Sequence, residues 1–427
     1  MSEPIFIARQ DTLEQEILPA HWLAQYKLFG EESYTFQDKE IWKKLCMSRA
    51  AANDRDMHAE ALEEMLTTFS AEHTGKWMLT VYGMDAAVLE GLASMAAIAA
   101  NGTAMAAVAG NALLMHAITN SETAMQAISR SQTAMQRIAN STTAMDAISG
   151  SKIARGAVQA SPYYNSYIKE NDMAIAKLVV SFANLASAGY SGMAGVAADA
   201  TAMNAVAASS TAMNAVAASS VARNAISASP YYDEKIKEND MAIAKLVVGF
   251  ANLESARYSG CAGMAADSTA MTAVAASSTA MTAVAASGVA LQAIAQAYKN
   301  TANMLKFLQA VNASDTLVKR IYSTLTNATG LFDAAQLGAQ DSVTNADKWA
   351  TTSAAPKAFL ACACGYYDTR SNSVNVTYNG TVIAQNKTGT AKPGSVTSTN
   401  VNAITMAPST FTENGDGWLA VQKFTAK

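Results

Sequence analysis

The sequence is poor in charge, aromatic rings, proline and cysteine. Of its 427 residues 15% are charged and 7% are aromatic, and only 7 are proline. A net charge of −4 argues against a protein that tracks nucleic-acid phosphates, so no nucleic-acid partner is predicted. Half of the residues are apolar, but alanine supplies much of that half and buries little area per side chain. The composition therefore favours thin, extended packing over a thick globular core.

The four cysteines provide neither a disulfide framework nor a metal site. Cys46 and Cys261 are isolated, and Cys362 and Cys364 would lie on one face of a strand, which is poor geometry for bridging each other. The four histidines share no metal-ligand spacing with one another or with a cysteine. We predict reduced structural thiols, no bound metal and no cofactor.

Targeting and catalytic motifs are also missing. The N-terminus lacks the basic-then-apolar start of a secretory signal. Residues 268–298 carry no charge, but serine and threonine interrupt the apolar run, so no membrane span is predicted. The sequence has no phosphate loop, dinucleotide fingerprint or nucleophile elbow. We predict that the chain is not an enzyme.

What the sequence has in abundance is a ten-residue repeat. The triplet Thr-Ala-Met begins at eight positions, mostly ten residues apart, with the consensus T-A-M-x-A-[VI]-[AS]-x-S-x. A longer period contains the first, because residues 153–220 align without gaps onto residues 221–288 with 52 of 68 positions identical. Duplication of this kind adds length, whereas an enzyme site is not usually copied whole in tandem.

Each ten-residue repeat has the pattern of a short amphipathic helix. At 100° per residue its second, third, sixth and seventh positions (Ala, Met, Val or Ile, Ala) fall within about 140° of arc. Ten residues end roughly 80° short of three full turns, so the apolar face cannot continue along one straight helix. Ser209 and Ser219 precede new repeats, where serine is favoured as an N-cap. We predict two-turn helices, each closed by a serine turn and stabilised by stacking.

Two alternative shafts fit the same period. Ten is an even number, so a β-solenoid would also keep its faces in register, although alanine and methionine are weak strand formers. A trimeric, locally overwound helical bundle is the other alternative.

Longer helices are predicted within each 68-residue unit and after the repeats. Ser161-Pro162 and Ser229-Pro230 supply an N-cap followed by proline in the first turn, and the helical pattern continues from the first pair to about Ala188. Residues 298–330 resume a helical pattern, and residues 331–356 read as a polar linker.

The N-terminal end differs from the repeats. Residues 1–80 hold 14 acidic and 8 basic side chains and three of the tryptophans, Trp22, Trp42 and Trp77. This α-rich region is the candidate for docking to a larger assembly; a plain folding cap for the repeats is the alternative.

The C-terminal end has the period of strands. Residues 357–427 alternate apolar and polar side chains between Asn-Gly turns, which predicts a small antiparallel β domain. Tyr366, Tyr367, Tyr378 and Trp418 could form a glycan-contacting surface, since aromatic faces stack on pyranose rings. The alternative is that these four rings are core or inter-subunit contacts.

The predicted fold is mainly α: an elongated repeat shaft of short stacked helices plus long helices, an α-rich head and a C-terminal antiparallel β domain. Its segments are the head (1–80), a decapeptide shaft (81–152), two repeat units (153–220 and 221–297), a helical stalk with linker (298–356) and the β-rich tip (357–427).

The run "STAMNAVAASSTAMNAVAAS" resembles short repeats of bacteriophage tail-fibre and related virion proteins, over roughly residues 100–295. The resemblance implies a virion appendage, commonly a homotrimer. Residues 1–80 would dock to other virion proteins, and residues 357–427 would contact a host surface glycan or protein. A virion connector or decoration protein without receptor binding, and a bacterial surface adhesin, are the alternative functions. No functional residue is carried over from the family.

Overall fold

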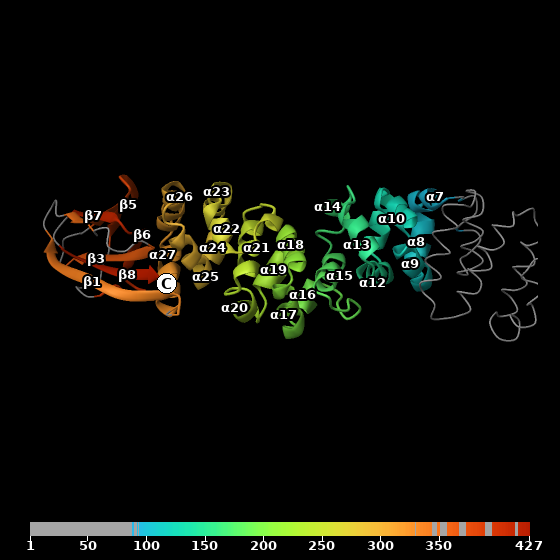
Figure 1. Cartoon of the computed structure of the whole chain (residues 1–427), viewed down its shortest axis with the longest axis horizontal. Helices are drawn as coiled ribbons and strands as arrows, with labels where there is room; N and C mark the ends of the chain where they lie inside the picture. Colours follow the sequence, from blue (N-terminus) through green and yellow to red (C-terminus); the bar gives the residue numbers. More distant parts are fainter. Residues whose placement is uncertain are drawn as a thin grey trace, which may run out of the picture. The chain divides into compact units, whose positions relative to one another are not determined.

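The computed structural model describes residues 94–328, 330–343, 348–350, 357–366, 373–388, 395–414 and 417–427, together with Val88 and Leu92 (Figure 1). The chain divides into two compact units between Val196 and Ala197, so the boundary falls inside the predicted repeat unit 153–220. The head predicted over residues 1–80, with Cys46, lies outside the described residues.

The described part of the first unit is helical, and its helices follow the ten-residue beat. They are α7 (Met95–Ala100), α8 (Gly102–Gly110), α9 (Ala112–Thr119), α10 (Glu122–Ser129), α11 (Gln132–Ala139), α12 (Thr142–Gly150), α13 (Lys152–Gln159), α14 (Tyr164–Tyr167), α15 (Asp172–Phe182) and α16 (Met193–Ala197).

Helix α11 shows how one repeat folds. Ser131 adopts an extended backbone, and its hydroxyl accepts a hydrogen bond from the N–H of Ala134 at 3.2 Å. The buried residues are those at the second, third, sixth and seventh positions of the repeat, as the helical wheel predicted. In α11 they are Ala134, Met135, Ile138 and Ala139.

Stacking occurs between helices three apart in the chain. In the first unit α8 packs against α11, α9 against α12, and α10 against α13; in the second unit α21 packs against α24 and α24 against α27. The bend between α23 and α24 is 104°, so three consecutive helices bring the chain back above its starting point. We call each such triplet a three-helix layer.

Serine hydroxyls also join one layer to the next. The Oγ atoms of Ser131 and Ser141 donate to the carbonyls of Ala99 and Ala109, both at 2.6 Å and both 32 residues earlier in the chain. Ser151, Ser161 and Ser229 make the same bond over the same separation. Each hydroxyl thus accepts a bond from its own helix or turn and donates to the layer below. We call these five residues the serine ladder.

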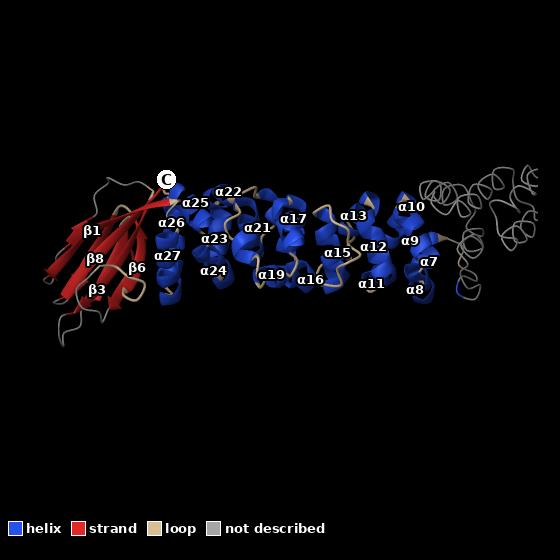
Figure 2. Ribbon diagram, turned by 90° about the horizontal axis from the view of Figure 1, so that it is seen from below, coloured by secondary structure: helices blue, strands red, loops and turns tan. Residues whose placement is uncertain are grey.

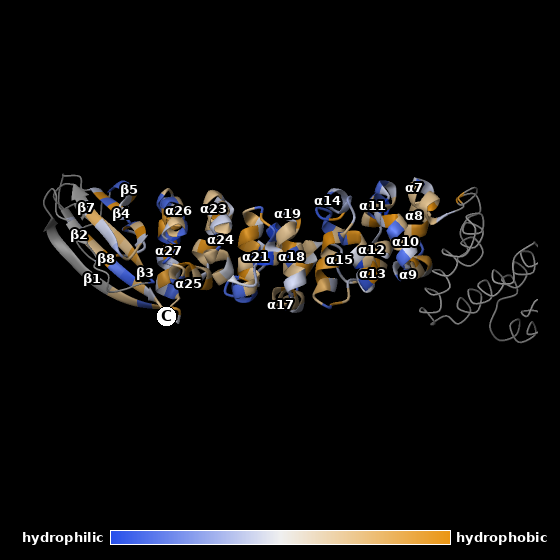
Figure 3. Ribbon diagram, turned by 45° about the horizontal axis from the view of Figure 1, so that its top comes forward, coloured by the Kyte–Doolittle hydropathy of each residue, from blue (hydrophilic) through white to orange (hydrophobic). Residues whose placement is uncertain are grey.

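The long helix predicted from residue 161 to about Ala188 is wrong. Asn171 has an extended backbone, and its side chain accepts from the N–H of Ala174 at 3.0 Å, so a new helix begins there. Asn171 lies ten residues after Ser161, so the beat of the repeats runs through the segment. The helix α15 is buried continuously from Ala174 to Ser181, and Figure 3 shows it as largely hydrophobic.

The helices of the second unit repeat this plan. They are α17 (Ala200–Ala208), α18 (Ser210–Ala218), α19 (Ser220–Ser227), α20 (Tyr232–Lys235), α21 (Asp240–Phe250), the 3-10 helix η3 (Ser255–Arg257), α22 (Cys261–Ala266), α23 (Ser268–Ala276), α24 (Ser278–Ala286), α25 (Gly288–Gln296), α26 (Thr301–Asn312) and α27 (Asp315–Asn327).

The serines that separate consecutive helices test three further predictions from the sequence. Ser209 is extended between α17 and α18, so the β-solenoid and the continuous overwound helix are both wrong for the described repeats. The single helix predicted over 298–330 is likewise wrong, because Ser314 caps α27.

The C-terminal strands form two four-stranded antiparallel sheets (Figure 2). Their orders are β1-β8-β3-β6 and β2-β7-β4-β5. The predicted antiparallel β domain is confirmed, but the linker predicted over 331–356 is wrong, because β1 pairs along β8. The strands are β1 (Phe332–Val343), β2 (Lys348–Ala350), β3 (Ala358–Tyr366), β4 (Ser373–Tyr378), β5 (Thr381–Thr388), β6 (Val401–Met406), β7 (Ser409–Asn414) and β8 (Gly417–Ala426).

The last helices cover the edge of the first sheet. The buried Asn312 accepts from the backbone N–H of Ile404 on edge strand β6 at 3.0 Å and donates to its carbonyl at 2.7 Å. The Phe307 and Phe359 rings lie 6.3 Å apart across the same junction. Because the side-chain amide replaces a missing neighbouring strand, the β region and the last helices form one continuous core.

Two other predictions concern thiols and membranes. Cys261, Cys362 and Cys364 are buried thiols that form no disulfide within the described residues, as predicted for structural thiols. Among the described helices, none is by itself long and apolar enough to cross a membrane; α23 and α24 meet that test only as a bent pair.

Candidate functional site

Two of the four aromatic residues proposed for glycan contact are buried. Trp418 on β8 is completely buried and Tyr378 on β4 is 3% exposed, and the two strands belong to different sheets. Neither ring can stack on a sugar in this chain, which fits the alternative that they are core residues. The Tyr366 side chain and all of Tyr367 lie outside the described part of the chain.

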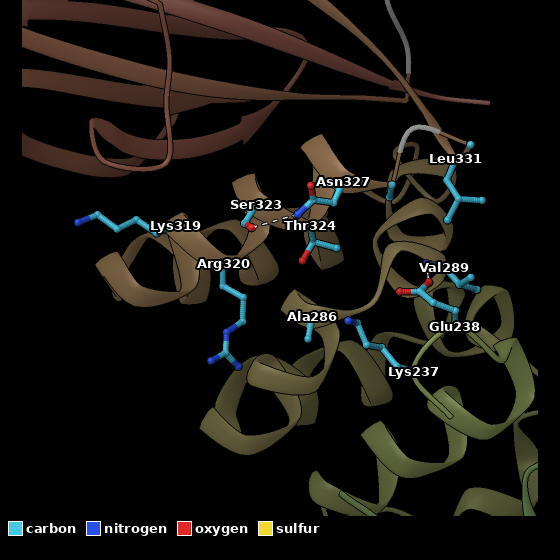
Figure 4. Close-up of a pocket in the computed structure, with 12 residues that line it drawn as sticks. Lys237, Glu238, Ala286, Val289, Lys319, Arg320, Ser323, Thr324, Asn327 and Leu331 are labelled. Carbon is cyan, nitrogen blue, oxygen red and sulfur yellow. Dashed lines mark hydrogen bonds between the residues drawn. The ribbon is translucent and has the colours of Figure 1, made fainter. Parts of the chain in front are cut away.

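The strongest candidate for a site is a cleft of about 840 Å³ in the second unit (Figure 4). The turn between α20 and α21 forms one wall with Lys237 and Glu238, and α27 forms another with Lys319 and Arg320. We call it the basic cleft.

Helix packing positions the basic side chains. Lys237 follows the fully buried Ile236, which anchors the turn in the core. Helix α27 buries Val318 and Ile321, so the intervening Lys319 and Arg320 are exposed. Figure 4 shows the ends of Arg320 and Lys237 reaching to either side of Ala286, while Lys319 extends away from them.

The carboxylate in the cleft is occupied by backbone groups. The two oxygens of Glu238 accept from the N–H groups of Gly288 and Val289, each at 3.1 Å, at the start of α25. The Nζ of Lys237 lies 3.4 Å from the Oδ1 of the exposed Asp233. Lys319 and Arg320 form no ion pair with any described residue, so the cleft carries a net positive charge.

Short polar groups complete the lining. Ser323, Thr324 and Asn327 lie along α27, and the Nδ2 of Asn327 is 3.5 Å from the Oγ of Ser323. Thr324 already donates to the carbonyl of Ala285 at 2.7 Å. No aromatic ring is among the described residues that line the cleft. The surface can therefore offer cations and hydrogen-bonding groups, but no stacking platform.

A second cleft, of about 920 Å³, lies in the first unit beside His116 and Asp146. Asp146 accepts from the ammonium of Lys177 at 2.5 Å and from the hydroxyl of Ser187 at 2.8 Å. Since its carboxylate already has these internal partners, this cleft is the weaker candidate for binding.

The duplicated repeat gives the second unit a corresponding buried lysine. Lys245 is 1% exposed and donates to Oδ1 of Asn214 at 2.7 Å and to the carbonyl of Ser255 at 3.0 Å. Asn214 lies 68 residues after Asp146, the same offset that separates Lys245 from Lys177, so Lys245 lacks the carboxylate that Lys177 has. Burial lowers the pKa of Lys245. Both lysines join a helix, the loop after it and the helix below.

Sequence reasoning missed the basic cleft. Lys319-Arg320 and Lys237 lie far apart in the sequence, and each is one of several cations on an amphipathic pattern. The sequence does indicate an exposed polar face over residues 315–327. The opposite wall of the cleft cannot be predicted in this way, because it depends on which helices stack.

No known protein-family model matches the chain, and no curated protein is similar to it. Within the described residues, no group of His, Cys, Asp and Glu side chains could hold a metal ion. The tail-fibre resemblance of the repeats thus stays a prediction.

Proposed function

We propose that this chain is a non-enzymatic structural protein of a virion, a bacteriophage tail fibre in which three-helix layers form an elongated shaft. The single observation that carries this proposal is the stacking of short helices three apart in the chain, which lets length grow by repetition. Docking of residues 1–80 to the particle, assembly into a homotrimer and contact of the C-terminal end with the host surface follow from the family resemblance.

The duplication adds whole helices. Helix α15 of the earlier copy corresponds to α21 of the later one, and α18 corresponds to α24. Within the second unit α18 packs against α21, and α21 packs against α24. A further copy of residues 221–288 would therefore continue a stack in which helices three apart meet.

The β region supports a terminal role. Repeat stacks need a cap that covers their last apolar face. The first sheet packs on α26 through Asn312 and Phe307, and its edge strand β6 also contacts α27. Removal of residues 357–427 would uncover this core, so it would not be a clean test of cell binding.

The proposed shaft is tested by inserting a second copy of residues 221–288 directly after residue 288. Helices pack about 8–10 Å apart, so two added layers should lengthen the particle by roughly 16–20 Å without widening it. Electron microscopy of the purified full-length protein and the longer variant provides the measurement. A compact particle, or one that grows in width, would refute the proposed shaft.

Host contact is tested separately by asking whether the purified protein competes with virions for adsorption to cells. Competition supports the receptor-binding fibre. Lengthening without competition would favour a virion connector or decoration protein.

A further inference from the structure

We propose that the basic cleft binds an acidic oligosaccharide, one that carries carboxylate or phosphate groups. The biological setting, a host surface polysaccharide, rests on the proposed function; binding itself can be measured without it. The expected saccharide contact therefore lies at the side of the last helices, and not on the buried aromatic rings of the β region.

The charges of the cleft favour an anion. Lys237, Lys319 and Arg320 line it, and the nearby Glu238 is held by two backbone N–H groups. Lys319 and Arg320 have no carboxylate partner in the described structure, so a ligand would not have to break an existing ion pair with either. Arg320 can bind a carboxylate or phosphate through two parallel hydrogen bonds.

The other lining groups favour a saccharide over a nucleic acid. Single-stranded nucleic acids bind on aromatic platforms together with basic grooves, and the described lining of the cleft has no aromatic ring. Ser323 and Asn327 instead offer hydroxyl and amide groups that suit sugar hydroxyls. The volume of about 840 Å³ lies in the range of small-molecule sites.

The test uses the full-length protein and tetragalacturonate, which carries one carboxylate per sugar, in isothermal titration calorimetry. Binding is expected at low ionic strength, with a marked loss near 1 M salt, where the Debye length is roughly 3 Å. Maltotetraose, the neutral control, should not bind. A double variant, Lys319→Glu with Arg320→Glu, should weaken binding by at least about tenfold.

The duplication supplies a matched control for the remaining lysine. Lys169 occupies in the earlier copy the position that Lys237 occupies in the later one. Lys237→Glu should weaken binding several-fold, whereas Lys169→Glu should leave it unchanged. Circular dichroism of every variant checks that the helices are retained.

Three results would overturn the inference. They are no binding of tetragalacturonate, equal loss in the Lys169→Glu control, and binding of a DNA oligonucleotide as tight as that of the saccharide. Particle length is measured independently, so the proposed shaft can survive a failure of the cleft.

Discussion

Replacing Ser141 by alanine tests whether the serine ladder stabilises the stack. Its Oγ accepts from the N–H of Ala144 at 3.1 Å and donates to the carbonyl of Ala109 at 2.6 Å. Losing a helix N-cap costs about 1 kcal/mol, and losing the partly buried hydrogen bond to Ala109 costs about 1 kcal/mol more. Together these give about 2 kcal/mol, or roughly a 30-fold rise in local opening.

Hydrogen exchange followed by mass spectrometry measures this directly, because it resolves opening along the chain. Peptides covering α12 and the end of α8 should exchange roughly 30-fold faster in Ser141→Ala. Ser129→Ala is the control, since the Ser129 hydroxyl bonds only to the carbonyl of Gln126 on the surface. That variant should stay within about 0.5 kcal/mol of the parent.

A second variant separates the two roles of the hydroxyl. Ser141→Asp keeps an N-cap of the kind that Asp199 and Asp267 provide elsewhere, but its carboxylate cannot donate to the Ala109 carbonyl. Exchange should therefore remain faster than in the parent. If Ser141→Ala exchanged less than about threefold faster, or no faster than the surface control, the ladder would contribute nothing to stacking.

The buried lysine and the close contact of α21 with α18 give three further predictions. Asn214→Asp should raise the free energy of unfolding by about 1–2 kcal/mol in denaturant titrations, because it gives Lys245 a carboxylate of the kind that Asp146 provides to Lys177. Because folding lowers the pKa of Lys245, the unfolded chain binds more protons than the folded protein. The free energy of unfolding of the parent, relative to that of Asn214→Asp, should therefore rise as the pH increases toward 10.5. A difference between the two proteins that does not change with pH would contradict this assignment. Gly249→Ser should destabilise by about 1–3 kcal/mol, seen as earlier unfolding, because its Cβ would lie 2.5 Å from the Ala217 carbonyl oxygen. The corresponding position of the earlier copy is a serine. If Gly249→Ser left the stability unchanged, the reasoning from the close contact would be wrong.

Prediction from the sequence was most reliable for features that residues within a single repeat determine. The inward face of α11 and its start at Ser131 follow from side-chain period and capping chemistry alone. It failed at Asn171 and Ser314, where the apolar pattern continues but an extended residue caps a new helix. Helical spacing over ten or so residues does not distinguish one long helix from two short ones whose apolar faces both point inward.

The sequence by itself determined the short helices, their buried alanines and methionines, and the presence of a C-terminal antiparallel region, because capping and side-chain period act within a few residues. Tertiary structure alone decided the three-helix layers, the bonds of the serine ladder and the basic cleft. These features depend on groups that belong to different layers and lie far apart in the chain. Which helices meet depends on how the chain bends at each corner, as it does by 104° between α23 and α24.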